Sequence, residues 1–157
     1  MLQQSDETPA KASLCRYTVD IPQALIERLD KLAHKARRLM KCDVTRATLF
    51  RAAILFWLAT VAKASSSTIR EEIRQAAPLP YTLLHRCKPT WSSELDERLA
   101  KLGERLDARL AYSATGVRSA LVLAALRAWL LTAEDEPLKA SDTIRAGLLK
   151  RGRKPKR

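Results

Sequence analysis

The chain has 157 residues, with 29 lysines and arginines against 17 acidic residues, so its formal charge at pH 7 is +12. This length allows one compact domain with ragged ends and argues against a large enzyme. The positive charge predicts attraction to a polyanion, either a nucleic acid or an anionic membrane surface.

A short strand is the first expected element. Residues 16–22 alternate polar with β-favouring apolar residues, which places Tyr17, Val19 and Ile21 on one face. The proline at the end stops the strand and suits the first turn of a helix, whose apolar stripe runs through residues 25–40.

Two further helices are expected after the first one. Residues 41–44 interrupt the helical spacing, and Thr45 is suited to cap a second helix that continues to Thr60. Residues 68–71 form a capping-box pattern, which predicts a third, short helix that opens at the threonine of this pattern and closes at Pro78.

The order of elements then repeats in the second half of the chain. Three pairs of segments match: 25–32 with 95–102, 46–58 with 118–130 after a shift of two residues, and 66–70 with 141–145. The same register predicts a second strand, in which Trp91 matches Ile21 and Pro89 weakens the pattern. Two copies of one unit are therefore present.

The strand ending in Ile-Pro, the amphipathic helix and the segment 44–53 resemble the ribbon-helix-helix family of the Arc and CopG repressor type. The first copy matches well, and the second matches in its helices better than in its strand. In that family, strands from two subunits pair into an antiparallel ribbon that enters the major groove of DNA. The resemblance implies a mainly α-helical fold in which one chain forms a pseudo-dimer with a two-stranded antiparallel ribbon. This tandem arrangement resembles that of a plasmid-transfer protein of the same family.

The expected organisation follows from the two copies and the composition of the segments around them. The segments are a disordered N-terminal arm (1–14), a first ribbon-helix-helix unit (15–63), a linker with a short helix (64–84), a second unit (85–134), a short C-terminal helix (135–149) and a basic tail (150–157).

Strand side chains that face away from the core are expected to meet base edges in the major groove. The candidate base-reading residues are Arg16, Thr18, Asp20, Arg86, Lys88 and Thr90. Arginine and lysine suit guanine O6 and N7, and threonine suits a polar base edge or a thymine methyl. Asp20 suits either cytosine N4 or the orientation of an arginine. The alternative is that these residues are only solvated strand positions.

Two helix N-termini are expected to hold DNA phosphates, because they present free N–H groups and partial positive charge. The candidate phosphate-binding residues are Thr45 and Arg46 in the first unit and Thr115, Val117 and Arg118 in the second. The alternative is ordinary capping beside a surface arginine.

The C-terminal segment is basic and has no apolar anchor. Its charged residues are Lys150, Arg151, Arg153, Lys154, Lys156 and Arg157. It resembles an AT-hook in which Lys154 is inserted between Gly-Arg and Pro. Because this insertion disturbs the motif, we expect nonspecific phosphate binding in preference to minor-groove reading.

The sequence offers little for chemistry other than binding. Cys15, Cys42 and Cys87 form no CxxC pair and, with the histidines, lie at no recognised zinc spacing. No glycine-rich phosphate loop, nucleophile–base pair or paired carboxylate motif is visible. We therefore expect no enzyme activity, no metal and no cofactor. Phe56, Trp57 and Trp129, at helical spacing in apolar runs, are expected in the core and not on a stacking surface.

We expect a cytoplasmic, nucleoid-associated protein without membrane contact. Residues 1–12 are acidic and polar where a signal peptide needs basic residues and then an apolar run. The apolar stretch 52–62 is well short of the roughly 20 residues that span a bilayer.

The sequence thus predicts sequence-specific binding to double-stranded DNA, with transcriptional repression as the leading role. An accessory role at a plasmid transfer origin or partition site fits the same features. An antitoxin and a helical scaffold at a membrane surface are alternatives of another class. The basic tail disfavours the antitoxin, and paired polar strands have no use in the scaffold. Self-association on adjacent DNA sites stays open.

Overall fold

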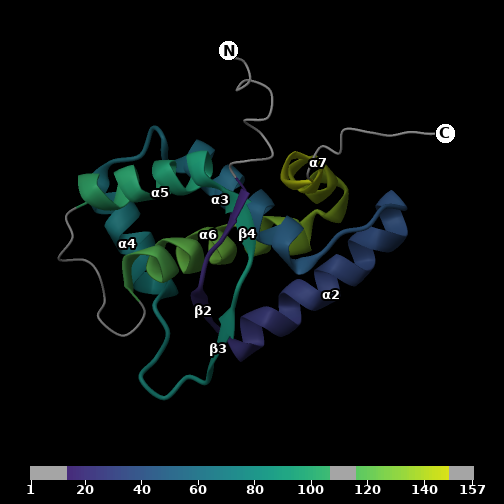
Figure 1. Cartoon of the computed structure of the whole chain (residues 1–157), viewed down its shortest axis with the longest axis horizontal. Coiled ribbons are helices and arrows are strands. Elements are labelled where there is room, and N and C mark those ends of the chain that lie inside the picture. Colours follow the sequence, from purple (N-terminus) through teal and green to yellow (C-terminus); the bar gives the residue numbers. More distant parts are fainter. Residues whose placement is uncertain (1–13, 107–115, 149–157) are drawn as a thin grey trace, which may run out of the picture.

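The computed structural model describes residues 14–106 and 116–148 (Figure 1). In these residues the chain is mainly helical, with six helices and four short strands. The strands pair antiparallel, and in Figure 1 the paired strands run across the front of the helices.

The strands of the two halves of the chain pair with each other in one register. Strand β1 (Leu14–Arg16) pairs with β4 (Thr90–Ser92), and β2 (Val19–Pro22) pairs with β3 (Leu84–Cys87). Between these paired stretches the Tyr17 amide donates a hydrogen bond to the Pro89 carbonyl at 2.9 Å. Residues 14–22 and 84–92 therefore form a single two-stranded ribbon, named so below.

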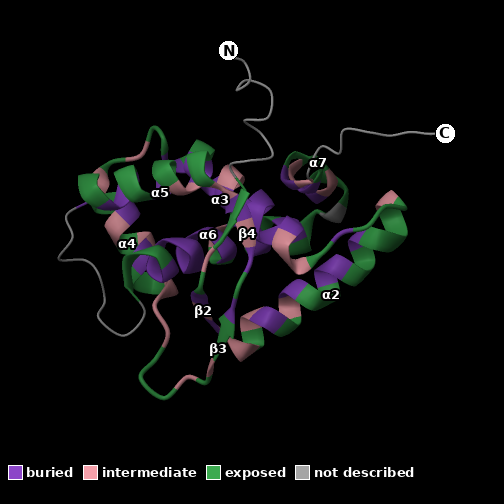
Figure 2. Cartoon of the chain, in the orientation of Figure 1, coloured by how far each residue is buried: buried purple, intermediate pink, exposed green. Residues whose placement is uncertain are grey.

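The predicted alternation of faces along the ribbon is confirmed. Val19, Ile21 and Trp91 are fully buried, and Cys87 is 6% exposed. Pro89, on the same face as Cys87 and Trp91, is also buried, whereas Asp20, Arg86, Lys88 and Thr90 on the other face are exposed or half-buried (Figure 2). Because the side chains of a strand alternate in direction, one face of the ribbon covers the helices and the other meets solvent.

The helices of the first half begin and end close to the predicted residues, with one exception. Helix α2 (Gln23–Met40) ends where Lys41 adopts a left-handed conformation with φ 54°. Helix α3 (Arg46–Val61) is capped, as predicted, by Thr45, whose side chain accepts a hydrogen bond from the Thr48 amide.

The prediction that the next helix opens at Thr68 is wrong. Helix α4 (Ser66–Ala76) is capped by Ser65, whose Oγ accepts a hydrogen bond from the Thr68 amide at 3.2 Å. The two hydroxyls lie 2.9 Å apart, so Thr68 joins the capping hydrogen bonds inside the first turn. Two good capping residues three positions apart compete, and the earlier one wins because it adds one turn of helix.

The second half repeats this order of elements. After β3 and β4 come α5 (Ser93–Arg105), α6 (Gly116–Asp135) and α7 (Pro137–Gly147). Helix α5 is capped by Ser92, whose side chain accepts a hydrogen bond from the Leu95 amide at 3.0 Å.

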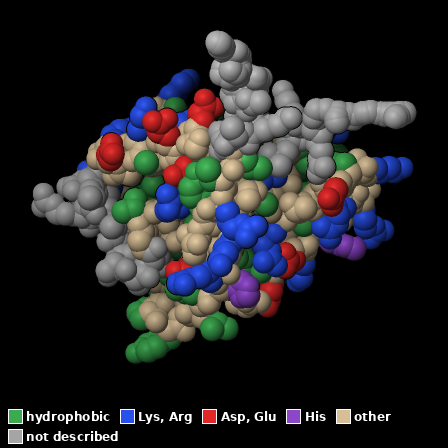
Figure 3. All heavy atoms as spheres, viewed as in Figure 1, with side chains coloured by type: hydrophobic (Ala, Val, Ile, Leu, Met, Phe, Trp, Pro, Cys, Tyr) green, Lys and Arg blue, Asp and Glu red, His purple; other side chains and the backbone are tan. Residues whose placement is uncertain are grey.

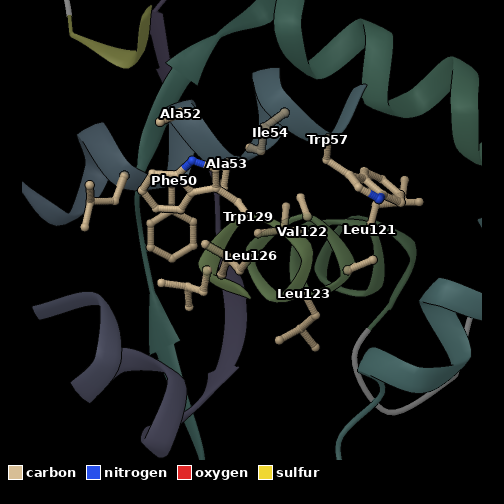
Figure 4. Close-up of a cluster of buried hydrophobic side chains, with 14 of the residues drawn as sticks. Phe50, Ala52, Ala53, Ile54, Trp57, Leu121, Val122, Leu123, Leu126 and Trp129 are labelled. Atoms are coloured by element: carbon tan, nitrogen blue, oxygen red, sulfur yellow. The ribbon is translucent and has the colours of Figure 1, made fainter. Parts of the chain in front are cut away.

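Helices α3 and α6 form the centre of the core (Figure 4). Both are apolar on nearly all sides, as expected for helices that neighbours surround. Trp57 and Trp129 are at most 1% exposed, which confirms that they belong to the core. Phe56 is only half-buried and packs against the edge of the core, so the prediction for this residue holds in part. Each buried indole N–H is satisfied: Trp57 donates to Glu72 at 2.9 Å and Trp129 to Thr143 at 2.8 Å.

The third helix of each half packs on the central helix of the other half. Helix α7 packs on α3, and α4 packs on α6. The approach of α7 to α3 is so close that a Cβ on Gly147 would lie 2.6 Å from the Thr48 carbonyl oxygen and 2.8 Å from the Ala52 nitrogen. Neither half can therefore bury its central helix without the other.

One helix of the described residues, α6, is long and apolar enough to cross a membrane by length and composition. In the structure it is the central core helix, and 61% of its apolar window is buried against the other elements.

We expect that the two halves do not fold separately. Fragments 1–83 and 84–157 should each lack a cooperative thermal transition by circular dichroism, because each would expose the core face of its ribbon strands and of α3 or α6. Mixing the fragments should restore the helical signal. A well-folded monomeric 1–83 fragment in sedimentation would contradict this.

Candidate nucleic-acid interface

The register of the ribbon brings the six candidate base-reading residues onto one face. Arg16 lies opposite Thr90, and Asp20 lies opposite Arg86. Thr18 and Lys88 lie between these pairs and are exposed. Residues opposite one another in an antiparallel pair point to the same side, so these side chains share the outer face of the ribbon. Asp20 and Thr90 are half-buried there, and the Thr90 hydroxyl accepts a hydrogen bond from a buried arginine. Figure 3 shows lysine and arginine side chains gathered there.

An ion pair joins the two strands on this face. Arg86 donates from Nε to the Asp20 carboxylate at 3.2 Å. The Arg86 side chain is 68% exposed and that of Asp20 is 23% exposed, so the guanidinium stands over the better-buried carboxylate. This geometry agrees with the interpretation in which Asp20 orients an arginine.

Two further arginines lie beside the middle of the ribbon, one from each central helix. Arg46 at the start of α3 lies near the Cys87 thiol, on whose pKa its charge has a lowering effect, and Arg118 in the first turn of α6 lies 4.8 Å above the Tyr17 ring. Tyr17 and Cys87 occupy one inward-facing position on each side of the central Thr18–Lys88 pair, one in each strand. The ribbon is therefore flanked on both sides by a guanidinium.

Carboxylates of the preceding helices hold both arginines in place. Arg46 donates from Nε and Nη2 to Asp30 at 3.1 and 2.9 Å, and Arg118 donates from the same atoms to Asp96 at 2.9 and 3.0 Å. These hydrogen bonds raise the pKa of each guanidinium. A phosphate at this point would meet an oriented cation whose charge is already shared with a carboxylate.

An aromatic stack couples the second of these arginines to the ribbon. Tyr17 and Trp91 stack with ring centroids 4.7 Å apart, and the Trp91 indole donates to Asp96 at 3.2 Å. Burial, a hydrogen bond with Cys15 and the nearby Asp96 carboxylate raise the pKa of Tyr17 to about 12. Tyr17 therefore stays neutral at physiological pH and can stack beneath Arg118.

A buried arginine, which the sequence reasoning missed, supports the ribbon from behind. Arg51 is 8% exposed and donates to the Thr90 carbonyl at 2.8 Å, the Thr90 hydroxyl at 3.2 Å and the Gly147 carbonyl at 2.8 Å. Burial lowers its pKa. The available signal was a charged residue inside the apolar run of α3, next to Phe50 and Ala52.

The other central helix contacts the opposite strand in a similar way. Ser119, in the first turn of α6, is 4% exposed, and its Oγ accepts a hydrogen bond from the Asp20 amide at 3.2 Å. Helix α3 thus anchors the strand of the second half through Arg51, and α6 anchors the strand of the first half. The ribbon cannot shift without breaking one of these contacts.

Of the remaining candidate phosphate-binding residues, the structure describes Thr45 and Val117 but not Thr115 or the basic tail. Thr45 is exposed, and its hydroxyl caps α3. Val117 is 37% exposed in the first turn of α6. Thr115 and the basic tail, residues 150–157, lie outside the described residues.

The described residues contain no group of three or more metal-ligating side chains that could hold an ion. Cys15 and Cys42 are exposed, whereas Cys87 is buried beneath the ribbon, where burial raises the pKa of its thiol.

Comparison with known proteins found no matching family model, no significantly similar curated protein and no significantly similar solved structure.

We expect Arg51→Met to lower the free energy of unfolding. The Thr90 and Gly147 carbonyls would stay buried without their donor, at about 1 to 3 kcal/mol for each one that water cannot reach. Urea denaturation should show an earlier midpoint than wild type, and Arg38→Met on the exposed side of α2 serves as the control. An unchanged midpoint for Arg51→Met would remove the proposed support of the ribbon.

Proposed function

We propose that this chain is a tandem ribbon-helix-helix protein that binds double-stranded DNA through its ribbon and represses transcription by occupying an operator. The observation that carries the proposal is the single register that gathers Arg16, Thr18, Asp20, Arg86, Lys88 and Thr90 on one solvent-facing surface.

The size and charge of this surface suit the major groove. A groove about 12 Å wide admits a two-stranded ribbon, and the outward side chains of the ribbon reach the base edges. Arg16, Arg86 and Lys88 are all exposed there, on a chain with a formal charge of +12. A carboxylate that holds one of these arginines also reduces the number of directions in which it can bind, which favours specific over nonspecific contact.

The packing of the two halves supports the tandem architecture. Their strands pair with one another, and each half covers the central helix of the other. In the family that the sequence resembles, two subunits supply these parts. In this chain the segment between α4 and β3 joins the two halves that carry these strands and helices.

The flanking arginines fit contacts to the DNA backbone. Arg46 and Arg118 lie on opposite sides of the ribbon centre, each at the start of a helix whose N–H groups carry partial positive charge. We propose that they fix the position of the duplex while the ribbon reads it, a division typical of protein–DNA interfaces.

Replacing Arg16 and replacing Arg86 should affect different ends of the DNA site. The two strands offer different side chains, so the preferred site should not be a perfect palindrome. Selection of bound duplexes from a random pool should show relaxed preference at one end for Arg16→Ala and at the other for Arg86→Ala. Each lost bidentate contact should reduce discrimination by about 1 to 3 kcal/mol.

Arg38→Ala, on the exposed side of α2, is the matched control and should leave the selected site unchanged. A palindromic wild-type site would argue against base reading by this ribbon. So would an equal loss of affinity for every duplex in both ribbon variants.

Asp20→Asn should separate affinity from specificity. Removing the carboxylate removes repulsion from phosphates, so binding to random duplex DNA should strengthen and its salt dependence should steepen. The same change frees Arg86, so base preference at that end of the site should weaken. Titrations of selected and random duplexes over a range of salt concentrations measure both effects. Weaker binding to random DNA would contradict the proposed orientation of the ribbon face.

A further inference from the structure

The segment between α4 and β3 projects an apolar tip into solvent. Leu79 is 77% exposed, Tyr81 is 99% exposed and Leu83 is 72% exposed. In Figure 1 this segment extends beyond the helices at the lower left, and Figure 3 shows hydrophobic side chains at that end of the molecule. Large apolar residues so close together and so exposed mark an interaction surface.

This tip is held in a defined conformation. The Thr82 amide donates to the Leu79 carbonyl at 3.0 Å, which closes a turn with Pro80 at its second position. The Gln23 amide donates to the Leu83 carbonyl at 3.1 Å, which ties the turn to the end of the ribbon. The backbone at Tyr81 is therefore already ordered, so a partner would have to order only its exposed side chain.

A second apolar surface lies between α3 and α7, away from the tip (Figure 1). This groove is lined by Ala52, Leu55, Phe56, Ala59, Thr60, Asp142, Thr143 and Ala146. Its single charged lining residue is Asp142, an exposed carboxylate whose Oδ1 lies 3.9 Å from the Arg145 guanidinium on the same helix.

The corresponding place in the second half is occupied by polar groups. The position that matches Leu55 is Arg127, whose guanidinium donates to Gln75 at 3.3 Å and so connects α6 to α4. On α3 the shorter Leu55 leaves its side of the groove apolar. At this position the apolar lining of the groove therefore has no counterpart in the second half.

We propose that the turn 79–83 of one chain docks into the α3–α7 groove of a second copy, with the Tyr81 ring inserted and its hydroxyl donating to Asp142. Charge selects this occupant. Residues 75–84 carry no charged side chain, so the tip has no cation for a phosphate backbone. Two chains of formal charge +12 repel each other, and because neither the tip nor the groove lining contains a lysine or arginine, these surfaces can meet without bringing such residues together.

The resulting contact is head to tail. Because tip and groove are different surfaces, each added copy leaves one of each exposed, and assembly continues as an open chain. This association needs no DNA, so it can fail while the proposed DNA binding holds.

A complementation experiment with the full chain tests the proposal. Tyr81→Ser removes the tip, and Leu55→Arg places in the groove the residue that the second half already carries. In sedimentation velocity, wild type should form larger species as its concentration rises, and each variant alone should stay monomeric, with association about 30-fold weaker or more. An equimolar mixture should form dimers and stop there, because one variant supplies an intact groove and the other an intact tip.

Leu138→Ser is the matched control, since this residue is 79% exposed on α7 outside the groove, and it should associate like wild type. If Leu55→Arg loses its circular dichroism signal, Ala59→Arg at the exposed edge of the groove replaces it. A wild-type monomer at every soluble concentration overturns the proposal. So do folded single variants that still assemble, a mixture that stays monomeric, or Tyr81→Ser that lowers only DNA affinity.

Discussion

The antiparallel pairing of residues 14–22 with residues 84–92 constrains everything else in the molecule. A slip of one residue would turn Val19, Ile21 and Trp91 to solvent and bury the charged side chains between them. The register is fixed from behind, because Arg51 donates to Thr90 and Ser119 accepts from the Asp20 amide. Packing of the central helices and display of the outer face are therefore parts of one arrangement.

Features that depend on neighbouring residues could be predicted from the sequence. The alternation from Tyr17 to Ile21 specifies two faces, and the hydroxyl of Thr45 specifies a helix start, without knowledge of the tertiary fold. Features that depend on how helices cross could not. Neither the pairing of Arg118 with Asp96 nor the burial of Arg51 follows from spacing, because their partners are brought together by the fold. The predicted start of α4 was wrong for a local reason, because Ser65 and Thr68 are both suitable capping residues and Ser65 takes that position.

The two central helices carry different residues at two matching positions of the repeat. Arg51 is buried in α3, and Leu123 takes the matching place in α6. One turn further, the exposed arginine is Arg127 in α6, and α3 has Leu55. A homodimer could not make such changes on one side only, because each substitution would appear twice. Because both halves belong to one chain, one half can support the ribbon while the other keeps a polar exterior.

The chain connection between α4 and β3 also changes how the ribbon responds to dilution. A ribbon assembled from separate subunits comes apart when the concentration falls below the dissociation constant, and its subunits often lose their fold with it. In this chain the second strand is held near the first at an effective concentration that tethering sets, typically in the millimolar range for short flexible linkers. Its assembly is a first-order process that needs no encounter between molecules. A cell could keep the complete ribbon at only a few copies of the protein.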